Sequence, residues 1–401
     1  MKPNMARLDD YLYYHALAVH ARGDTAALRK YLRAARGKPE ELIRASCGPW
    51  EAAYRRISST VTSAKTYSPH SPALPSALPD PAAEWEKLAR IGARLIPASD
   101  ASFPAPLRNI PGAPFGIYLL GAPWPAETAA CGGGEASGRG APDGAGSPPA
   151  AIAVVGTRRA TPEGKAAARR FARELARAGS IIVSGLAFGI DAAAHEGALE
   201  GAGAGGRCTT VAVLAGGLDS VYPREHAKLA ERIIASGGAL ISEYPPGSPP
   251  YPDRFLERNR LVSGLSRGVL IVEAPAGSGA LATARFAAEQ GRDVFAVPGP
   301  ITHPNYEGPH GLIRQGAELV TKPEDILEAY GAAPEARTVR VMETLPPGER
   351  KVFGALAAHG APADVDKIAS LAKLEPQIVN RALSFLIAKE IVRETEGGYT
   401  I

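Results

Sequence analysis

The sequence has 401 residues, a hydrophobic fraction of 45% and a formal net charge of +4. A chain of this length exceeds the size that one hydrophobic core usually supports, so we expect a main domain with smaller satellites. The positive charge is too mild to identify a polyanionic partner, because the clustering of charge matters more than its sum. No stretch approaches the roughly 18 apolar residues that span a bilayer, and the first residues lack an apolar signal core. These features predict a cytoplasmic protein with no membrane partner.

Three cysteines, Cys47, Cys131 and Cys208, lie far apart in the chain. They form no C-x-x-C pair and no Cys/His spacing of the kind that binds zinc. We therefore expect a reducing compartment and no metal site.

The first part of the chain changes character several times. Apolar residues recur every three or four positions over residues 1–65, which predicts a small helical, SAM-like domain. Its excess of basic residues indicates a solvated helix face, with nucleic-acid contact as the alternative. Residues 66–82 are rich in Pro and Ser and predict a linker, and residues 83–121 predict a folded lead-in to the next domain. Residues 122–150 are rich in Gly, Ala and Pro and predict a disordered insertion, because they offer too little apolar surface to offset the ordering entropy.

Residues 151–330 alternate short β-branched runs with helical windows. The runs are AIAVVG, SIIVSG, TTVAVLAGG, GALISE, GVLIVEA and DVFAVPG. The helical windows are residues 162–178, 191–200, 224–236 and 280–290. Repeated β-α units of this length predict an α/β fold, an extended Rossmann-like, doubly wound parallel sheet, with its ligand at the carboxyl ends of the strands.

The chain ends in a second small domain. Residues 331–345 predict a linker, and residues 346–401 predict three helices followed by a hairpin that turns at Gly397 and Gly398. Three helices and a hairpin are typical of a winged helix. The third helix carries only Arg381 and Lys389 as basic groups, so contact with DNA and contact with protein both stay open.

The end of the first β-branched run is a candidate phosphate site. Gly156 lets the backbone approach an anion and Arg158 can grip one bidentately, just before a helix with Thr161 as its expected N-cap. The dinucleotide fingerprint G-x-G-x-x-G is absent, so we expect neither NAD nor FAD and predict no cofactor.

The second run leads into a further glycine-rich turn. Ser184, Gly185 and Gly189 offer a hydroxyl and backbone amides to an anion. Asp191 and His195 stand four residues apart and could form an acid/base pair. No nucleophile is placed beside them, so we interpret Asp191 as a helix N-cap and His195 as a core or capping residue and predict no catalytic group.

The richest stretch for nucleic acid is 253–260. Phe255, Arg258, Asn259 and Arg260 interleave cations with an aromatic ring and an amide, the mixture that neutralises a single-stranded backbone and stacks a base. The alternative is a surface helix start in which the arginines pair with neighbouring acids.

A last glycine turn follows the fifth run. Ser278, Gly279 and Thr283 could line the same anion groove, although Gly-Ser turns also occur for purely geometric reasons.

Taken in order, eight segments of the chain resemble the DprA/Smf family of bacterial DNA-processing proteins. They are VGTRRATPEGK, SGLAFGIDAAAH, VAVLAGGLDSVYPREH, ALISEYPPG, FLERNRLVSGLS, VEAPAGSGALATARFAAEQGR, VFAVPGP and GLIRQGAELV. The resemblance implies a non-enzymatic homodimer that binds single-stranded DNA, protects it and helps to load the RecA recombinase in natural transformation or related recombination. By motif, it assigns backbone phosphate to Gly156 and Arg158, the groove lining to Ser184, Gly185 and Gly189, and bases and phosphates to Phe255, Arg258, Asn259 and Arg260.

The chain departs from the family pattern at particular places. Leu256 stands where the family usually has a Pro, and His310 stands where it usually has an Asn. The insertion over 122–150 is also unusual, and we interpret it as a tolerated surface loop.

Two other function classes compete with DNA handling by this family. A nucleoside-monophosphate phosphoribohydrolase has a similar core, but its Pro-Gly-Gly-x-Gly-Thr-x-x-Glu motif would need a Glu that the register around Ser278 lacks. A transcription factor would read duplex DNA through the winged helix, and the sparse basic residues of the third helix argue against it.

Overall fold

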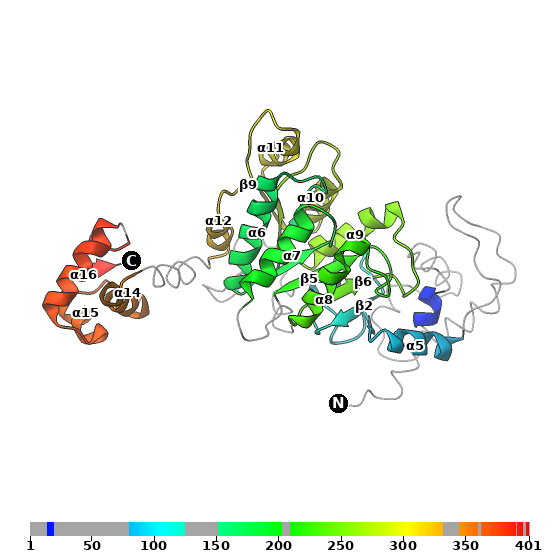
Figure 1. The fold of residues 1–401 in the computed structure, drawn as a ribbon, viewed down its shortest axis with the longest axis horizontal. Helices are drawn as coiled ribbons and strands as arrows, with labels where there is room; N and C mark the ends of the chain where they lie inside the picture. Colours follow the sequence, from blue (N-terminus) through cyan, green and yellow to red (C-terminus); the bar gives the residue numbers. More distant parts are fainter. Residues whose placement is uncertain are drawn as a thin grey trace. The chain divides into compact units, whose positions relative to one another are not determined.

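The computed structural model describes residues 14–19, 80–124, 151–202, 209–331, 345–359, 362–389, 391–395 and 398–400 (Figure 1). The described residues up to Ile326 form a larger compact unit, and those from Leu327 onward form a smaller one. Most of the predicted amino-terminal domain (1–65), of the linkers 66–82 and 331–345 and of the insertion 122–150 lies outside the described residues.

The larger unit is built on a nine-stranded sheet with the order β1-β2-β6-β5-β4-β3-β7-β8-β9. Burial on both faces explains why the strands from β3 to β7 read as continuous apolar runs. Seven strands of the sheet run parallel. They are β3 (Ala151–Val155), β4 (Ile181–Ser184), β5 (Thr210–Leu214), β6 (Ala239–Ser242), β7 (Gly268–Ile271), β8 (Asp293–Ala296) and β9 (Glu318–Leu319). The predicted doubly wound, Rossmann-like sheet is confirmed.

The predicted lead-in extends this sheet. Strand β2 (Gly116–Gly121) pairs antiparallel with β6, placing Tyr118 opposite Ser242, and β1 (Arg94–Pro97) pairs antiparallel with β2. Helix α5 (Pro81–Arg90) precedes them, and the short η2 (Ala105–Leu107) connects them.

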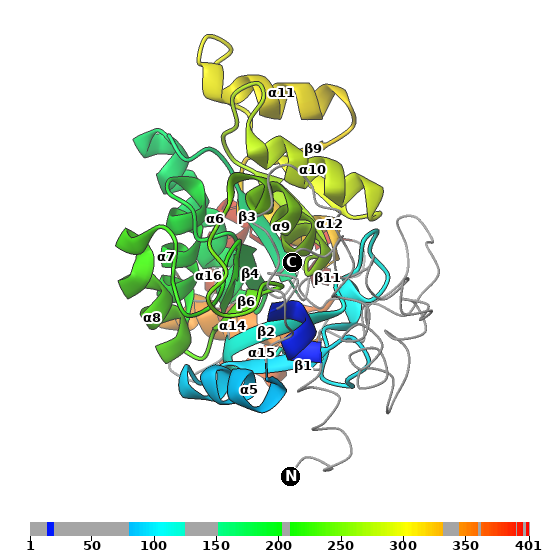
Figure 2. The ribbon, with the colours of Figure 1, turned by 90° about the vertical axis from the view of Figure 1, so that its right-hand side faces the viewer.

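Helices cover both faces of the sheet. Figure 2 shows α6, α7 and α8 on one side of the strands and α9 and α10 on the other, as right-handed crossovers in opposite directions from β3 require. Their bounds are α6 (Pro162–Arg177), α7 (Ile190–Gly201), α8 (Ala227–Ala235), α9 (Pro252–Gly264) and α10 (Gly279–Glu289). The remaining helices of this unit are η4 (Arg224–His226), η5 (Pro304–Tyr306) and α11 (Glu307–Arg314), and α12 (Pro323–Ala329) spans the boundary with the next unit.

Each face of the sheet is covered by an apolar core. Leu261 and Ala284 belong to the core under α9 and α10, and Ile233 belongs to the core under α8. The helical residues 14–19 contribute Leu17 to this second core, and His15 Nδ1 lies 2.9 Å from the Tyr118 hydroxyl.

The strand order reverses between β3 and β7. The chain leaves β3 toward β4 on one side and returns to β7 on the other side, so this is the point at which an open α/β sheet binds its ligands. The Thr157 N–H, just after β3, donates to the Glu273 carbonyl just after β7 at 2.7 Å. This bond ties together the loops that the sequence selected as a candidate site.

Among the described residues, the smaller unit contains three helices and a hairpin. These are α14 (Pro347–His359), α15 (Val365–Ala372), α16 (Pro376–Ala388) and the antiparallel pair β10 (Arg393–Thr395) and β11 (Gly398–Thr400). The elements agree with those expected, and their assignment to the winged-helix class stays a prediction. Ile378 and Phe385 on α16 are 47% and 48% exposed, so the third helix presents apolar as well as basic side chains.

Candidate nucleic-acid interface

The exposed centre of the candidate site is a stack of Arg158 on Phe255. The guanidinium carbon of Arg158 lies 4.8 Å from the centroid of the Phe255 ring, a cation–π distance. The ring of Tyr222 meets the ring of Phe255 edge-on at 5.6 Å, and Tyr222 is 48% exposed. The loops after β3 and β5 and the first turns of α9 therefore bring one cation and two aromatic rings together at the carboxyl edge of the sheet.

Gly156 holds the loop after β3 close to its neighbours. A β-carbon at this position would stand 2.5 Å from Ile190 Cγ1 and 2.7 Å from the Glu273 carbonyl oxygen. Any larger residue would push the Thr157–Arg158 backbone outward. The glycine thus fixes the position of the backbone that carries Arg158.

Arg258 lies inside the site rather than on its surface. It is 4% exposed, and its guanidinium donates to the carbonyl of Gly185 at 2.8 Å and to the carbonyl of Val213. These bonds join the ends of β4 and β5 to α9. Because the guanidinium offers almost no surface to a ligand, we move Arg258 from the expected DNA contacts to the framework of the site.

Arg260 is also occupied by the protein itself. Its guanidinium forms an ion pair with Glu243 at the end of β6, and the two side chains are 12% and 3% exposed. Glu257, the acid next to these arginines in the sequence, accepts instead from the Tyr244 hydroxyl at 3.0 Å. Asn259 donates its amide to the Gly279 carbonyl at 3.1 Å, which links α9 to the start of α10.

The turn after β4 is closely packed. Ser184 is fully buried and donates to the Val154 carbonyl at 2.7 Å. Gly185 leaves room for the Arg258 guanidinium, which a β-carbon there would meet at 2.5 Å. Ser184 and Gly185 therefore support the carboxyl edge of the sheet from beneath.

Asp191 does not cap α7 as expected. The N-cap is Gly189, with φ of 80°, and the Asp191 carboxylate instead accepts from the backbone N–H groups of Gly185 (3.1 Å) and Ala187 (3.4 Å). Burial raises the pKa of Asp191, and the positive charge of Arg258 opposes that rise. The carboxylate stabilises the turn over 185–187. This structural role explains the burial of Asp191 without a catalytic function.

His195 is a core residue, as the sequence indicated. It is fully buried, and its Nδ1 lies 2.7 Å from the Thr210 hydroxyl, which itself donates to the Ile182 carbonyl. Nδ1 must therefore carry the hydrogen, and Nε2 is a buried acceptor that has no hydrogen-bond partner among the described residues. Burial lowers the pKa of His195 to about 3, with the charges of His226 and Arg258 adding to the effect. A histidine held neutral in this way supports packing rather than proton transfer.

The glycine turn after β7 begins α10. Ser278 caps this helix by accepting from the Ala280 N–H at 3.3 Å, and Thr283, 1% exposed, faces the core. Gly279 stands at the helix start, where a β-carbon would find Leu256 at 3.9 Å. The structure thus brings the start of α10, with Ser278 and Gly279, to Asn259 and buries Thr283.

A buried carboxylate holds these loops in place. Glu273 is fully buried and accepts from the Thr161 N–H (2.9 Å), the Thr161 hydroxyl (2.5 Å) and the Asn305 amide (3.0 Å). Since Thr161 is also the N-cap of α6, one acid connects β7 to the start of that helix.

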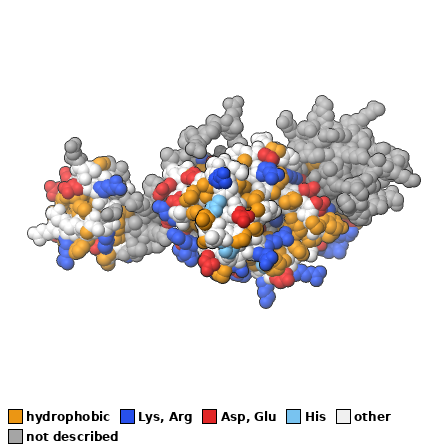
Figure 3. All heavy atoms as spheres, turned by 90° about the horizontal axis from the view of Figure 1, so that it is seen from above, with side chains coloured by type: hydrophobic (Ala, Val, Ile, Leu, Met, Phe, Trp, Pro, Cys, Tyr) orange, Lys and Arg blue, Asp and Glu red, His pale blue; other side chains and the backbone are white. Residues whose placement is uncertain are grey.

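Charge on one face of the larger unit is mixed. On the face shown in Figure 3, Lys and Arg side chains lie among acidic and hydrophobic ones and do not merge into one basic surface. Within the described part of the chain, no group of His, Cys, Asp and Glu is arranged to hold a metal ion, and no helix is long and apolar enough to cross a membrane. Recognition of an anion therefore depends on local groups such as Arg158.

Residues 138–331 match the family model of the DNA recombination-mediator protein A. Through this segment the chain is similar to the DprA/Smf proteins. It is 53% identical over 177 residues to the protein Smf of Escherichia coli, and 45% identical over 177 residues to the DNA processing protein DprA of Bacillus subtilis. Each alignment covers 44% of this chain, and the chain spans 46% and 58% of the length of those two relatives.

The fold agrees with this similarity. The X-ray structure of the DNA processing protein A from Streptococcus pneumoniae superposes with a TM-score of 0.55 at 28% identity, covering 80% of this chain and 97% of that one. The DprA/Smf segment contains every residue selected from the sequence, and the structure separates them into an exposed group around Arg158 and Phe255 and a buried framework around Arg258.

The sequence missed one member of the exposed group. Tyr222 follows β5 in the segment DSVYPREH, at the carboxyl end of a parallel strand. That position, shared with Arg158 after β3, is the signal that could have identified it.

Proposed function

We propose that this protein binds single-stranded DNA at the carboxyl edge of its parallel sheet. The observation that carries the proposal is the stack of Arg158 on Phe255, with Tyr222 against the same ring. A guanidinium neutralises backbone phosphate while aromatic rings stack bases, and the two together form the usual platform for single-stranded nucleic acid.

The same geometry favours a single strand over a duplex. Stacking on Phe255 or Tyr222 needs an unstacked base, and in duplex DNA every base face is already covered. The mixed surface charge adds little to non-specific duplex binding, which depends on many phosphate contacts at once.

In the cell, we propose that the bound strand is protected and passed to a recombinase. The matching family is named for mediating recombination, and the resemblance of the sequence to DprA/Smf proteins points to RecA as the recombinase, to a cytoplasmic homodimer and to natural transformation or related recombination. The framework residues Arg258, Arg260 and Glu273 would keep the platform rigid in this role.

The geometry gives less support to the nucleotide-cleaving alternative. A hydrolase of that class needs a carboxylate free to act at the glycine turn. Glu273, the acid that precedes this turn, is fully buried and accepts three hydrogen bonds from Thr161 and Asn305. The Glu273 carboxylate is used to hold the loops together. DNA binding therefore explains the site better than nucleotide cleavage.

Fluorescence anisotropy of a labelled oligo-dT strand and of a matched duplex tests the proposal. We expect the single strand to bind more tightly than the duplex and its affinity to fall steeply with salt, with a log-log slope of about −0.7 for each phosphate contacted. Equal affinity for both DNAs, or a flat salt response, together with release of free base from AMP, would favour the hydrolase instead.

A further inference from the structure

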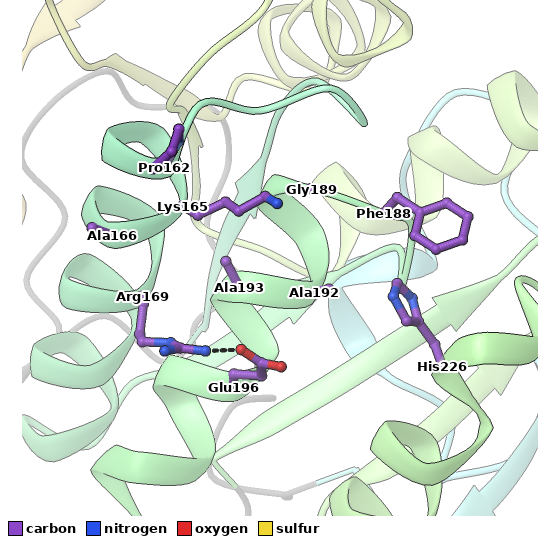
Figure 4. Close-up of a pocket in the computed structure, with 10 residues that line it drawn as sticks. All are labelled: Pro162, Lys165, Ala166, Arg169, Phe188, Gly189, Ala192, Ala193, Glu196 and His226. Atoms are coloured by element: carbon purple, nitrogen blue, oxygen red, sulfur yellow. Dashed lines mark hydrogen bonds and ion pairs between the residues drawn. The ribbon is translucent and has the colours of Figure 1, made fainter.

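A pocket lies beside the Arg158–Phe255 platform, on the side of α6 and α7. Figure 4 shows its lining residues, which come from the first two turns of both helices, the turn after β4 and the short helix η4. Its volume is about 360 Å³. That volume lies within the range of small-molecule sites, roughly 300–1,000 Å³.

One wall of the pocket is aromatic. The rings of Phe188 and His226 meet edge-on with centroids 4.9 Å apart, and Phe188 is 42% exposed. His226 Nδ1 lies 2.8 Å from the Leu186 carbonyl, which can only accept, so Nδ1 carries a hydrogen. In the neutral ring Nε2 is then an acceptor, and the ring is held in one orientation.

The opposite wall is cationic. Lys165 is exposed on α6, and its side chain extends toward Gly189 at the start of α7, where the helix dipole is positive (Figure 4). Within the residues that the structure describes, the Lys165 ammonium has no hydrogen bond and no ion pair. The nearby Arg169 is instead neutralised by Glu196, so the available positive charge is concentrated at Lys165.

Small residues lie between the two walls. Ala192 and Ala193 on the first turn of α7 line the pocket, so nothing bulky fills the space between Lys165 and the Phe188 ring. An aromatic wall, a free cation and a floor of small residues together suit a flat heterocycle that carries an anionic group.

We propose that this pocket binds one nucleotide, with the base against Phe188 and His226 and the phosphate at Lys165. The pocket adjoins the platform, because Gly189 packs against the Thr157–Arg158 backbone. A DNA strand bound at Arg158 could therefore place its next nucleotide in this pocket. For a nucleotide that belongs to such a strand, the inference rests on the proposed function. A free nucleoside monophosphate offers the same chemistry.

Photo-crosslinking of an oligo-dT strand that carries one 5-iodouracil, followed by peptide mass spectrometry, tests the proposal. We expect two crosslinked regions in the wild-type protein, one at Phe255 or Tyr222 and one at Phe188 or His226. Filling the pocket in Ala192→Leu should remove the second crosslink and keep the first. Lys165→Ala should weaken binding of the strand about tenfold, and Arg170→Ala, an exposed arginine on the same helix that does not line the pocket, should not.

Titration of dTMP into the wild type and into Lys165→Ala separates the two sources. A pocket crosslink without dTMP binding assigns the site to the bound strand, and dTMP binding that Lys165→Ala abolishes assigns it to free nucleotides as well. Crosslinks confined to Phe255 and Tyr222, with no dTMP binding, would overturn the pocket and leave the proposed function standing. If the strand binds nowhere but dTMP still binds in a Lys165-dependent way, the proposed function falls and the nucleotide pocket stands.

Discussion

Gly189 and Thr157 approach so closely that a β-carbon on residue 189 would stand 2.3 Å from the Thr157 carbonyl oxygen. The same glycine has φ of 80° and begins α7, and its neighbour Ile190 donates its N–H to that carbonyl at 3.3 Å. The loops after β3 and β4 are therefore locked together directly beneath Arg158. Several consequences of this framework can be measured.

Replacing the glycine should unlock these loops. Gly189→Ala forces a left-handed backbone and a backbone clash at once, so we expect a loss of more than about 2 kcal/mol in the free energy of unfolding. Gly277→Ala is the matched control, since φ is 76° there but nothing lies within 4 Å of the added carbon. It should cost about 1 kcal/mol, the backbone term alone. Urea denaturation followed by tryptophan fluorescence would show the difference, and equal losses would mean that the close packing is unimportant.

Arg258 should matter for stability and Arg158 for binding. Arg258→Ala leaves the Asp191 carboxylate buried without its compensating cation, so we expect a loss of about 3–5 kcal/mol in the free energy of unfolding. Arg158→Ala removes an exposed side chain and should leave the urea midpoint almost unchanged. A wild-type midpoint for Arg258→Ala would show that this guanidinium is not part of the framework.

His195 should make the protein sensitive to acid. The folded protein keeps this imidazole neutral down to a pKa of about 3, whereas the unfolded chain takes up a proton near pH 6.5. Its contribution to stability is therefore complete above pH 6.5 and is lost as the pH falls from there toward 3. From this residue alone we expect the free energy of unfolding to decrease by about 2 kcal/mol between about pH 7 and pH 5.

The difference between wild type and His195→Gln isolates this effect from other titrating groups. Glutamine cannot take up a proton in this range, so the variant should lose less stability on acidification, whatever its stability at neutral pH. If the free energy of unfolding changed with pH in the same way for both proteins, His195 would take up its proton as readily in the folded state as in the unfolded chain, and the prediction would be wrong.

The strands and helices of the Rossmann-like core could be predicted because their signals lie in short stretches of the sequence. A buried parallel strand reads as a continuous apolar run, and cap residues such as Thr161 and Ser278 mark where helices begin. The antiparallel strands β1 and β2 could not be assigned to this sheet, because β2 pairs with β6, far along the chain.

The burial of charged side chains was harder to predict than the fold. Three arginines stand close together in the segment over 253–260, yet Arg258 is covered by the Gly185 and Val213 carbonyls and Arg260 by Glu243. These partners come from strands β4, β5 and β6, and a single sequence does not show which strand end a helix will meet. The segment therefore looked like an exposed cationic surface when most of its charge is internal.

The most direct test of the central claim is the salt dependence of oligo-dT affinity for wild type, Arg158→Ala and Phe255→Ala, with Arg170→Ala as the control. Arg158 acts on phosphate, so its removal should weaken binding and reduce the log-log salt slope by about 0.7. Phe255 stacks a base, so its removal should weaken binding by about tenfold and leave the slope unchanged. Wild-type affinity and slope in both variants would contradict the assignment of single-stranded DNA to the Arg158–Phe255 platform.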